Sequence, residues 1–144
     1  MSGADPHDLE RFVEAQESSI DVVKRELRSG RKRSHWMWFV FPQIAGLGRS
    51  ETAKRYAIED LEEAEAYLAH PLLGSRLREC TGLVVDIDGR TANEIFGSPD
   101  DLKFQSSMTL FEAAADDTSV FGDALDQYYD GDRDLDTLTR LGDT

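Results

Sequence analysis

Short runs of apolar side chains at helical spacing constrain the fold of this chain more than any other feature. Ile20, Val23 and Leu27 lie on one helical face, for example, and Gly30 provides a natural stop. Serine, threonine or aspartate precedes several other runs and can cap a helix, as at Asp8 and Ser98. The pattern predicts helices at about residues 8–16, 20–29, 51–57, 61–70, 71–88, 92–96, 99–111, 120–129 and 135–141.

The length of 144 residues suits one compact domain that buries roughly 70% of the surface exposed by its unfolded chain. Charged residues make up 31% of the chain and hydrophobic residues 40%, a balance typical of a folded protein. We therefore predict an all-α fold of about seven to nine short helices. A flexible lead at residues 1–7 would precede a single helical domain at 8–144.

The net charge of −13 repels nucleic acid and anionic membranes, so we expect neither as a partner. Cys80 is the only cysteine, which excludes an internal disulfide, and its apolar neighbours predict a buried, inert thiol. The histidines lack metal-ligand spacing, so we predict no metal site and no cofactor. With no signal pattern and no apolar run near the ~20 residues of a membrane span, the sequence indicates a cytoplasmic protein.

The segment from Arg31 to Gly48 is the most unusual part of the sequence. It contains both tryptophans, two of the seven phenylalanines and one of the three histidines, directly after a basic cluster. Apolar residues occupy both faces between Trp36 and Phe41, so a buried strand and a buried helix fit equally well. Pro42 would end either element.

Charge is unevenly distributed along the chain. Residues 24–33 hold six basic residues and one acidic residue, a net charge of +5, whereas residues 112–144 carry a net charge of −8. One interpretation is that the basic cluster docks onto the acidic C-terminal helices or forms a solvated face. The other is a pocket for a phosphorylated small molecule, because the planar guanidinium of arginine donates two parallel hydrogen bonds to phosphate.

Two polar-aromatic groups of residues are candidates for such a pocket. Tryptophan side chains either fill the core or stack on a ligand ring, and the polar residues beside them need buried partners or a cavity. The candidate ligand-binding residues are Arg31, Lys32, Ser34, His35, Trp36, Trp38, Gln43, Lys103, Ser106 and Ser107.

Residues 100–107 also support two interpretations. Acids in the first helical turn stabilise a helix by interaction with its dipole, and small residues allow close packing. Alternatively, Asp100, Asp101 or His35 is a catalytic acid or base, although no recognised nucleophile motif is present. The site hypothesis requires Trp36 and His35 to line one cavity together with Asp101 and Lys103. Side chains that are buried and satisfy one another would instead indicate a core role.

Several segments resemble the bacterial domain-of-unknown-function 1810 family, including its mycobacterial members. The segments are Phe12–Gln16, Gly30–Gln43, Tyr56–Ile58, His70–Gly74, Ile95–Lys103 and Ser106–Phe111. This resemblance implies a compact, mostly helical fold and no established activity. Members sometimes carry the label calpastatin, but no segment here resembles a calpain inhibitor.

A fainter likeness connects Gln16, Trp36 and the segment Ile95–Lys103 with helical glycosidases of NAD and ADP-ribose. Those enzymes cleave an N-glycosidic bond with carboxylates and aromatic stacking. Phe96 stands where they place tryptophan, and no position here matches their catalytic carboxylates.

The sequence therefore leaves three functional hypotheses. The first is a protein that binds a phosphorylated ribose or a nucleotide-type small molecule. The second is a non-catalytic interaction or structural domain, and the third is an N-glycosidase acting on ADP-ribose-like substrates. Whether the protein is an enzyme, and which protein it contacts, stays open at this stage.

Overall fold

The structure is a computed structural model that describes residues 5–115 and 120–142. In these ranges it contains ten helices and no strands. Their bounds are α1 Glu10–Glu17, α2 Ile20–Ser29, α3 Met37–Val40, α4 Glu51–Arg55, α5 Leu61–Ala69, α6 Leu73–Val85, α7 Ala92–Phe96, α8 Asp100–Ala114, α9 Val120–Tyr129 and α10 Leu135–Gly142.

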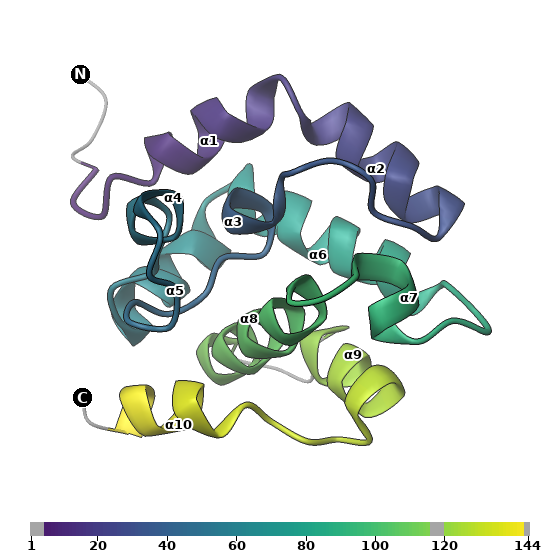
Figure 1. Cartoon of the computed structure of the whole chain (residues 1–144). Coiled ribbons are helices and arrows are strands. Elements are labelled where there is room, and N and C mark those ends of the chain that lie inside the picture. The colour runs from purple at the N-terminus through teal and green to yellow at the C-terminus, as the bar shows by residue number, and fades with distance from the viewer. Residues whose placement is uncertain (1–4, 116–119, 143–144) are drawn as a thin grey trace.

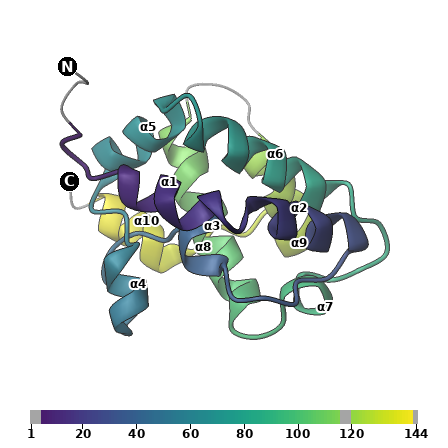
Figure 2. The same ribbon diagram turned by 90° about the horizontal axis from the view of Figure 1, so that it is seen from above.

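Helix α8 is the centre of the packing, as Figure 1 shows, because α5, α7, α9 and α10 all contact it. Viewed from above, α1 and α2 cross over α3 and the middle of the bundle (Figure 2). Two aromatic clusters fill the core. The centre of the Phe104 ring lies 4.9 Å from that of Phe41 and 4.7 Å from that of Phe96, and the ring centres of Tyr67 and Phe111 are 5.2 Å apart. These large buried rings supply much of the apolar area that drives folding.

The predicted all-α, single-domain fold is confirmed. The tenth helix is α3, a single turn inside the tryptophan segment, where the sequence did not distinguish helix from strand. Trp36 and Phe41 flank this turn with φ angles of −132° and −125°, outside the helical range. No helix in the described ranges is long and apolar enough to span a membrane.

Several helix ends follow the local sequence signals. The helix predicted at 71–88 is shorter at both ends, because α6 begins at Leu73 and ends at Val85. Ser50, Asp60 and Thr91 cap their helices through side-chain oxygens, and Gly30 ends α2 with a φ of 84°. The predictions for Asp8 and Ser98 were wrong.

At the start of α1 the cap comes from farther upstream than expected. Asp8 has a φ of 52°, and the Asp5 carboxylate instead accepts from the Leu9 and Glu10 N–H groups. At α8 the residue before the helix is Pro99, with no side-chain cap. The four residues at the start of the predicted flexible lead lie outside the described ranges.

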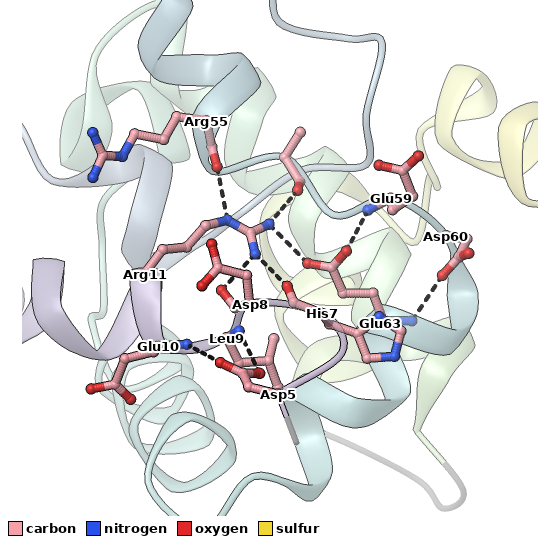
Figure 3. A network of polar contacts seen from close by, with 11 residues as sticks. Asp5, His7, Asp8, Leu9, Glu10, Arg11, Arg55, Glu59, Asp60 and Glu63 are labelled. Atoms are coloured by element: carbon pink, nitrogen blue, oxygen red, sulfur yellow. Dashed lines mark hydrogen bonds and ion pairs between the residues drawn. The ribbon is translucent and has the colours of Figure 1, made fainter. Parts of the chain in front are cut away.

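Arg11 ties the start of α1 to the connection between α4 and α5 (Figure 3). Its guanidinium bonds to the Glu63 carboxylate at 2.9 Å, and the Glu63 side chain is only 4% exposed. It also donates to the carbonyl oxygens of His7, Asp8, Arg55 and Ala57. Because one side chain satisfies carbonyls from two chain segments, it fixes the N-terminal segment against the body of the fold.

Cys80 lies in the core on α6, as predicted for a buried thiol. Burial raises the pKa of this thiol to about 12. Since the thiolate is the reactive form, Cys80 is an inert core residue at neutral pH.

Candidate functional site

Glu26 organises the first half of the tryptophan segment. It projects from α2, and its carboxylate accepts hydrogen bonds from the backbone N–H groups of Arg33 at 2.7 Å and Ser34 at 3.0 Å. The Ser34 hydroxyl and the indole N–H of Trp36, at 2.9 Å, also donate to it. We call this arrangement, Glu26 with residues 33–36, the Glu26 clasp. It satisfies the buried Glu26 carboxylate and places Trp36 in the core at 2% exposure.

The electrostatics of the clasp favour an ionised Glu26. Burial alone would raise the pKa of this carboxyl, but the donors from Ser34, Arg33 and Trp36 outweigh burial and lower it from 4.5 to about 2. Glu26 is therefore a carboxylate throughout the physiological range, and four neutral donors from the loop stabilise its negative charge.

The second half of the segment is positioned through hydrogen bonds to its backbone carbonyl groups. The amide of the buried Gln16 donates to the Phe39 carbonyl at 2.6 Å, which holds the end of α3 against α1. Beyond Pro42, an isolated parallel bridge pairs Ile44 with Ile58. The Ile58 N–H donates to the Gln43 carbonyl at 2.8 Å in this bridge, so the chain around Gln43 is fixed beside the end of α4.

An ion-pair chain joins the two predicted site segments. Lys32 binds the Asp100 carboxylate at 2.9 Å, and Lys103 approaches the other oxygen of the same carboxylate at 3.5 Å. Each ammonium also lies 5.2 Å from an indole ring centre, Lys32 above Trp36 and Lys103 above Trp38. The Lys32 side chain is 7% exposed and that of Lys103 is 24% exposed, so Lys103 is the more accessible end of the chain.

A small pocket opens beside Lys103. In this structure it has room for about one water molecule. Its lining is mostly apolar and aromatic, with Gln43 and Lys103 as its long polar side chains. The lining residues are Met37, Trp38, Phe41, Gln43, Ile44, Gly48, Ala53, Tyr56, Ala57 and Lys103.

Gly48 allows α4 to close one wall of this pocket. A Cβ atom at position 48 would lie 2.4 Å from the Ala53 Cβ, a distance that no folded chain tolerates without a shift. The close approach of loop and helix therefore depends on glycine at this position.

The sequence matches the family described as "protein of unknown function (DUF1810)" over residues 6–141. This chain belongs to the DUF1810 family. Its fold is also similar to the crystal structure of the conserved hypothetical protein Rv1873 from Mycobacterium tuberculosis, with a TM-score of 0.96 and 58% sequence identity. That similarity covers 97% of this chain and 100% of the mycobacterial chain. A search of the curated proteins gives no match.

In this DUF1810 member, the predicted site residues fall into three groups. Trp38, Gln43 and Lys103 line the pocket, and Lys32 and Asp100 adjoin it through the ion-pair chain. Ser34 and Trp36 belong to the Glu26 clasp. The remaining candidates, Arg31, His35, Asp101, Ser106 and Ser107, lie outside both groups. The shared-cavity requirement is therefore not met at this pocket: of the four side chains that it names, only Lys103 lines the pocket.

Those remaining candidates have varied surroundings. Arg31 and His35 are exposed, and the Asp101 carboxylate accepts from Asn93 at 3.3 Å. The Ser106 hydroxyl bonds to Asp134 at 3.1 Å. The Ser107 hydroxyl is completely buried and has no hydrogen-bond partner among the described residues.

Among the residues that the structure describes, the basic cluster forms no ion pair with the acidic C-terminal segment. Lys24 pairs with Glu79, and Lys32 pairs with Asp100. Arg31 and Arg33 are exposed beside an open surface. Within residues 5–115 and 120–142, no three histidine, cysteine or acidic side chains gather as metal ligands do.

Sequence reasoning missed Glu26 and Tyr56 as determinants of the site. Glu26 lies among basic residues on a helix, where a lone acid is typical of a solvated face. Its role depends on the chain turning back after Gly30, so that residues 33–36 contact Glu26. No local sequence pattern reveals this turn. Tyr56 packs against Phe39 at 5.6 Å and forms a wall of the pocket, but its sequence position at a helix end carries no comparable signal.

Proposed function

We propose that this protein binds a phosphorylated ribose or nucleotide-type small molecule at the pocket beside Lys103. The observation that carries the proposal is the position of the Lys103 ammonium, which lies over Trp38 at the mouth of an aromatic pocket. Ligand sites in proteins combine a mostly apolar lining with few polar groups, and this pocket has that composition.

The aromatic part of the pocket suits a flat ring. Trp38 is half-buried, so one face of its indole can contact a ligand, and Tyr56 lies on the same lining. Stacking on such rings tolerates different bases because every base has a π face. The Gln43 side chain adds one donor and one acceptor for a ring edge.

The ion-pair chain suits a phosphate. Lys103 is 3.5 Å from Asp100, whereas Lys32 holds the same carboxylate at 2.9 Å. Lys103 can therefore leave Asp100 for a phosphate while Lys32 continues to neutralise the carboxylate. The exposed Arg31 and Arg33 add positive charge next to Lys32, which favours approach of an anion to an otherwise acidic protein.

Binding requires the pocket to widen, because its present space holds about one water molecule. Trp38 and Lys103 are among the partly exposed members of the lining, and their side chains can swing outward. Ligand binding would select this opened arrangement. The free energy needed to open the pocket would lower the apparent affinity for the ligand.

Binding without bond cleavage is the simplest form of the proposal. The pocket lining, as formed by the described residues, contains no carboxylate, and Asp100 is engaged by two lysines. The N-glycosidase hypothesis needs a carboxylate at the reacting bond, and the interaction-domain hypothesis needs no ligand at all.

The experiment is calorimetric titration with ribose 5-phosphate, ADP-ribose, NAD and inorganic phosphate. We expect at least one ribose-phosphate compound to bind, and Lys103→Met to weaken it about 10-fold or more, a loss of about 1.4 kcal/mol. Lys24→Met is the matched control, because Lys24 also forms an ion pair and its side chain is 23% exposed.

Three outcomes separate the hypotheses. Binding that Lys103→Met weakens and Lys24→Met leaves intact supports the proposal. Equal weakening by both variants, or no binding at millimolar ligand, contradicts it and favours the interaction-domain hypothesis. Release of nicotinamide from NAD or of adenine from ADP-ribose in the same samples, analysed by chromatography, would support the N-glycosidase instead.

A further inference from the structure

Three exposed leucines lie at the edge formed by the start of α8 and by α10. Leu135 is 76% exposed, Leu102 is 60% exposed and Leu138 is 41% exposed. Leu135 and Leu138 are three residues apart on α10, so their side chains share one helical face. Single exposed leucines are common, but a cluster of them marks a contact surface more often.

Hydrogen bonds hold Leu102 and Leu135 on neighbouring pieces of chain. The Ser106 hydroxyl, one turn after Leu102, lies 3.2 Å from the Leu102 carbonyl and 3.1 Å from the carboxylate of Asp134. The Gln105 side chain donates to the Asp132 carbonyl at 3.0 Å. The first turns of α8 are therefore joined to the segment leading into α10, which runs along the lower edge of the view in Figure 1.

The segment that leads into α10 and to Leu135 is acidic. Residues 126–136 contain five aspartates and one arginine. That arginine, Arg133, is already paired with Glu112 and Asp126. Asp130, Asp132 and Asp136 are exposed. An open groove runs beside Leu135, lined by Gln105 and residues 131–136. We call Leu102, Leu135, Leu138 and this groove the leucine patch.

We propose that the leucine patch binds a basic amphipathic helix of a partner protein. The leucines supply the apolar contact, and the exposed aspartates select lysine or arginine at the edges of the partner helix. An acidic rim disfavours nucleic acid and anionic membranes, which leaves a positively charged protein segment as the matching occupant. No residue of the leucine patch lines the pocket beside Lys103, so this proposal is independent of the proposed ligand.

The test is fluorescence anisotropy with three labelled synthetic helical peptides. The first is built from lysine and leucine with all leucines on one face, the second has the same composition with the leucines dispersed, and the third replaces lysine with glutamate. We expect the first peptide to bind at least 10-fold more tightly than either of the others. Amide shifts in an NMR titration should centre on Leu102 and residues 131–138.

Two leucine variants make the test specific. Leu135→Asn with Leu102→Asn should weaken the first peptide about 10-fold or more, whereas Leu72→Asn, at another exposed leucine, should not. Both changes affect exposed side chains, so circular dichroism should stay unchanged. Equal binding of the dispersed peptide, no loss in the double variant, or no binding at millimolar peptide would each overturn the proposal. A concentration-dependent dimer in sedimentation that the double variant abolishes would assign the surface to a second copy instead, and would also overturn it.

Discussion

The two ends of the segment 31–43 differ in how completely their polar groups are satisfied. At the Glu26 clasp, one carboxylate accepts four hydrogen bonds from residues 33–36, and Trp36 is buried. At the other end, Trp38 is half-buried beneath Lys103, whose ammonium is 3.5 Å from its acidic partner. One end is closed around an internal carboxylate, and the other is the end where we propose that an external anion binds.

The difference separates structural from functional residues inside a stretch that the sequence presents as a unit. Donors and acceptors that are already hydrogen-bonded to each other would have to break those bonds to contact a ligand. They therefore resist rearrangement. Loosely held groups at a pocket rim can exchange partners at small cost. The closed end is therefore expected to control stability, and the open end to control binding.

The largest stability effect is expected at Glu26. Glu26→Ala removes the carboxylate that accepts four hydrogen bonds from residues 33–36. This change should lower the free energy of unfolding by about 3 kcal/mol. Glu26→Gln keeps one acceptor oxygen and should cost less. Urea denaturation of the three proteins measures this order, and a loss below about 0.5 kcal/mol for Glu26→Ala would contradict the structural role.

The same clasp predicts an acid-sensitive stability. The folded-state pKa of Glu26 is lowered from 4.5 to about 2, so the stabilisation is fully present above pH 4.5 and is lost as pH falls towards 2. A shift of this size corresponds to about 3 kcal/mol. Unfolding measured at several pH values should show this loss in the wild type, and a markedly smaller loss in Glu26→Gln. An equal loss of unfolding free energy in the two proteins as pH falls would refute this role of Glu26.

The two tryptophans should respond differently to the same substitution. Trp36→Phe deletes a donor to a carboxylate and should cost about 2 kcal/mol, whereas Trp38→Phe should cost about 0.5 kcal/mol or less. Chemical denaturation gives both values. Equal losses of unfolding free energy in the two variants would contradict the distinction between a closed end and an open end of the segment.

Adjacent serines on α8 provide a smaller contrast. Ser107→Ala should stabilise the protein by about 1 kcal/mol, because it removes a buried hydroxyl that lacks a partner. Ser106→Ala breaks the contact with Asp134 and should cost about 1 kcal/mol. The melting temperatures should therefore move in opposite directions. A lower melting temperature for Ser107→Ala would indicate a bound water or another partner at that hydroxyl.

The smallest stability effect is expected at Lys103. Its contact with Asp100 is long and partly exposed, so Lys103→Met should change the free energy of unfolding by about 0.5 kcal/mol or less. Thermal unfolding tests this directly. A much larger loss would make Lys103 a structural residue and would remove the support for a ligand at the open end.

Local signals predicted most of the helices, because caps and stops act within a few residues. Thr91 and Glu94 form a reciprocal capping box, and Gly30 ends α2 in a left-handed conformation. The local argument failed at Asp8, where Asp5 provides the cap from farther upstream. It also left α3 undecided, because a buried single turn has no amphipathic pattern.

The candidate site could be predicted only as a set of residue types. The sequence singled out residues 31–43 and 100–107, and the fold brings them together through Lys32, Asp100 and Lys103. It could not separate Trp36 from Trp38, since their burial depends on Glu26 from another element. Contacts between distant segments set that distinction, and local propensity contains no information about them.

The most direct test of the account is a fluorescence titration of Trp36→Phe, in which Trp38 is the remaining tryptophan, with ADP-ribose and ribose 5-phosphate. We predict a saturable change in Trp38 emission that Lys103→Met abolishes in the same background. In the complementary variant Trp38→Phe, the buried Trp36 should report little change. A ligand response from Trp36 with none from Trp38 would contradict the assignment of a closed structural end and an open binding end.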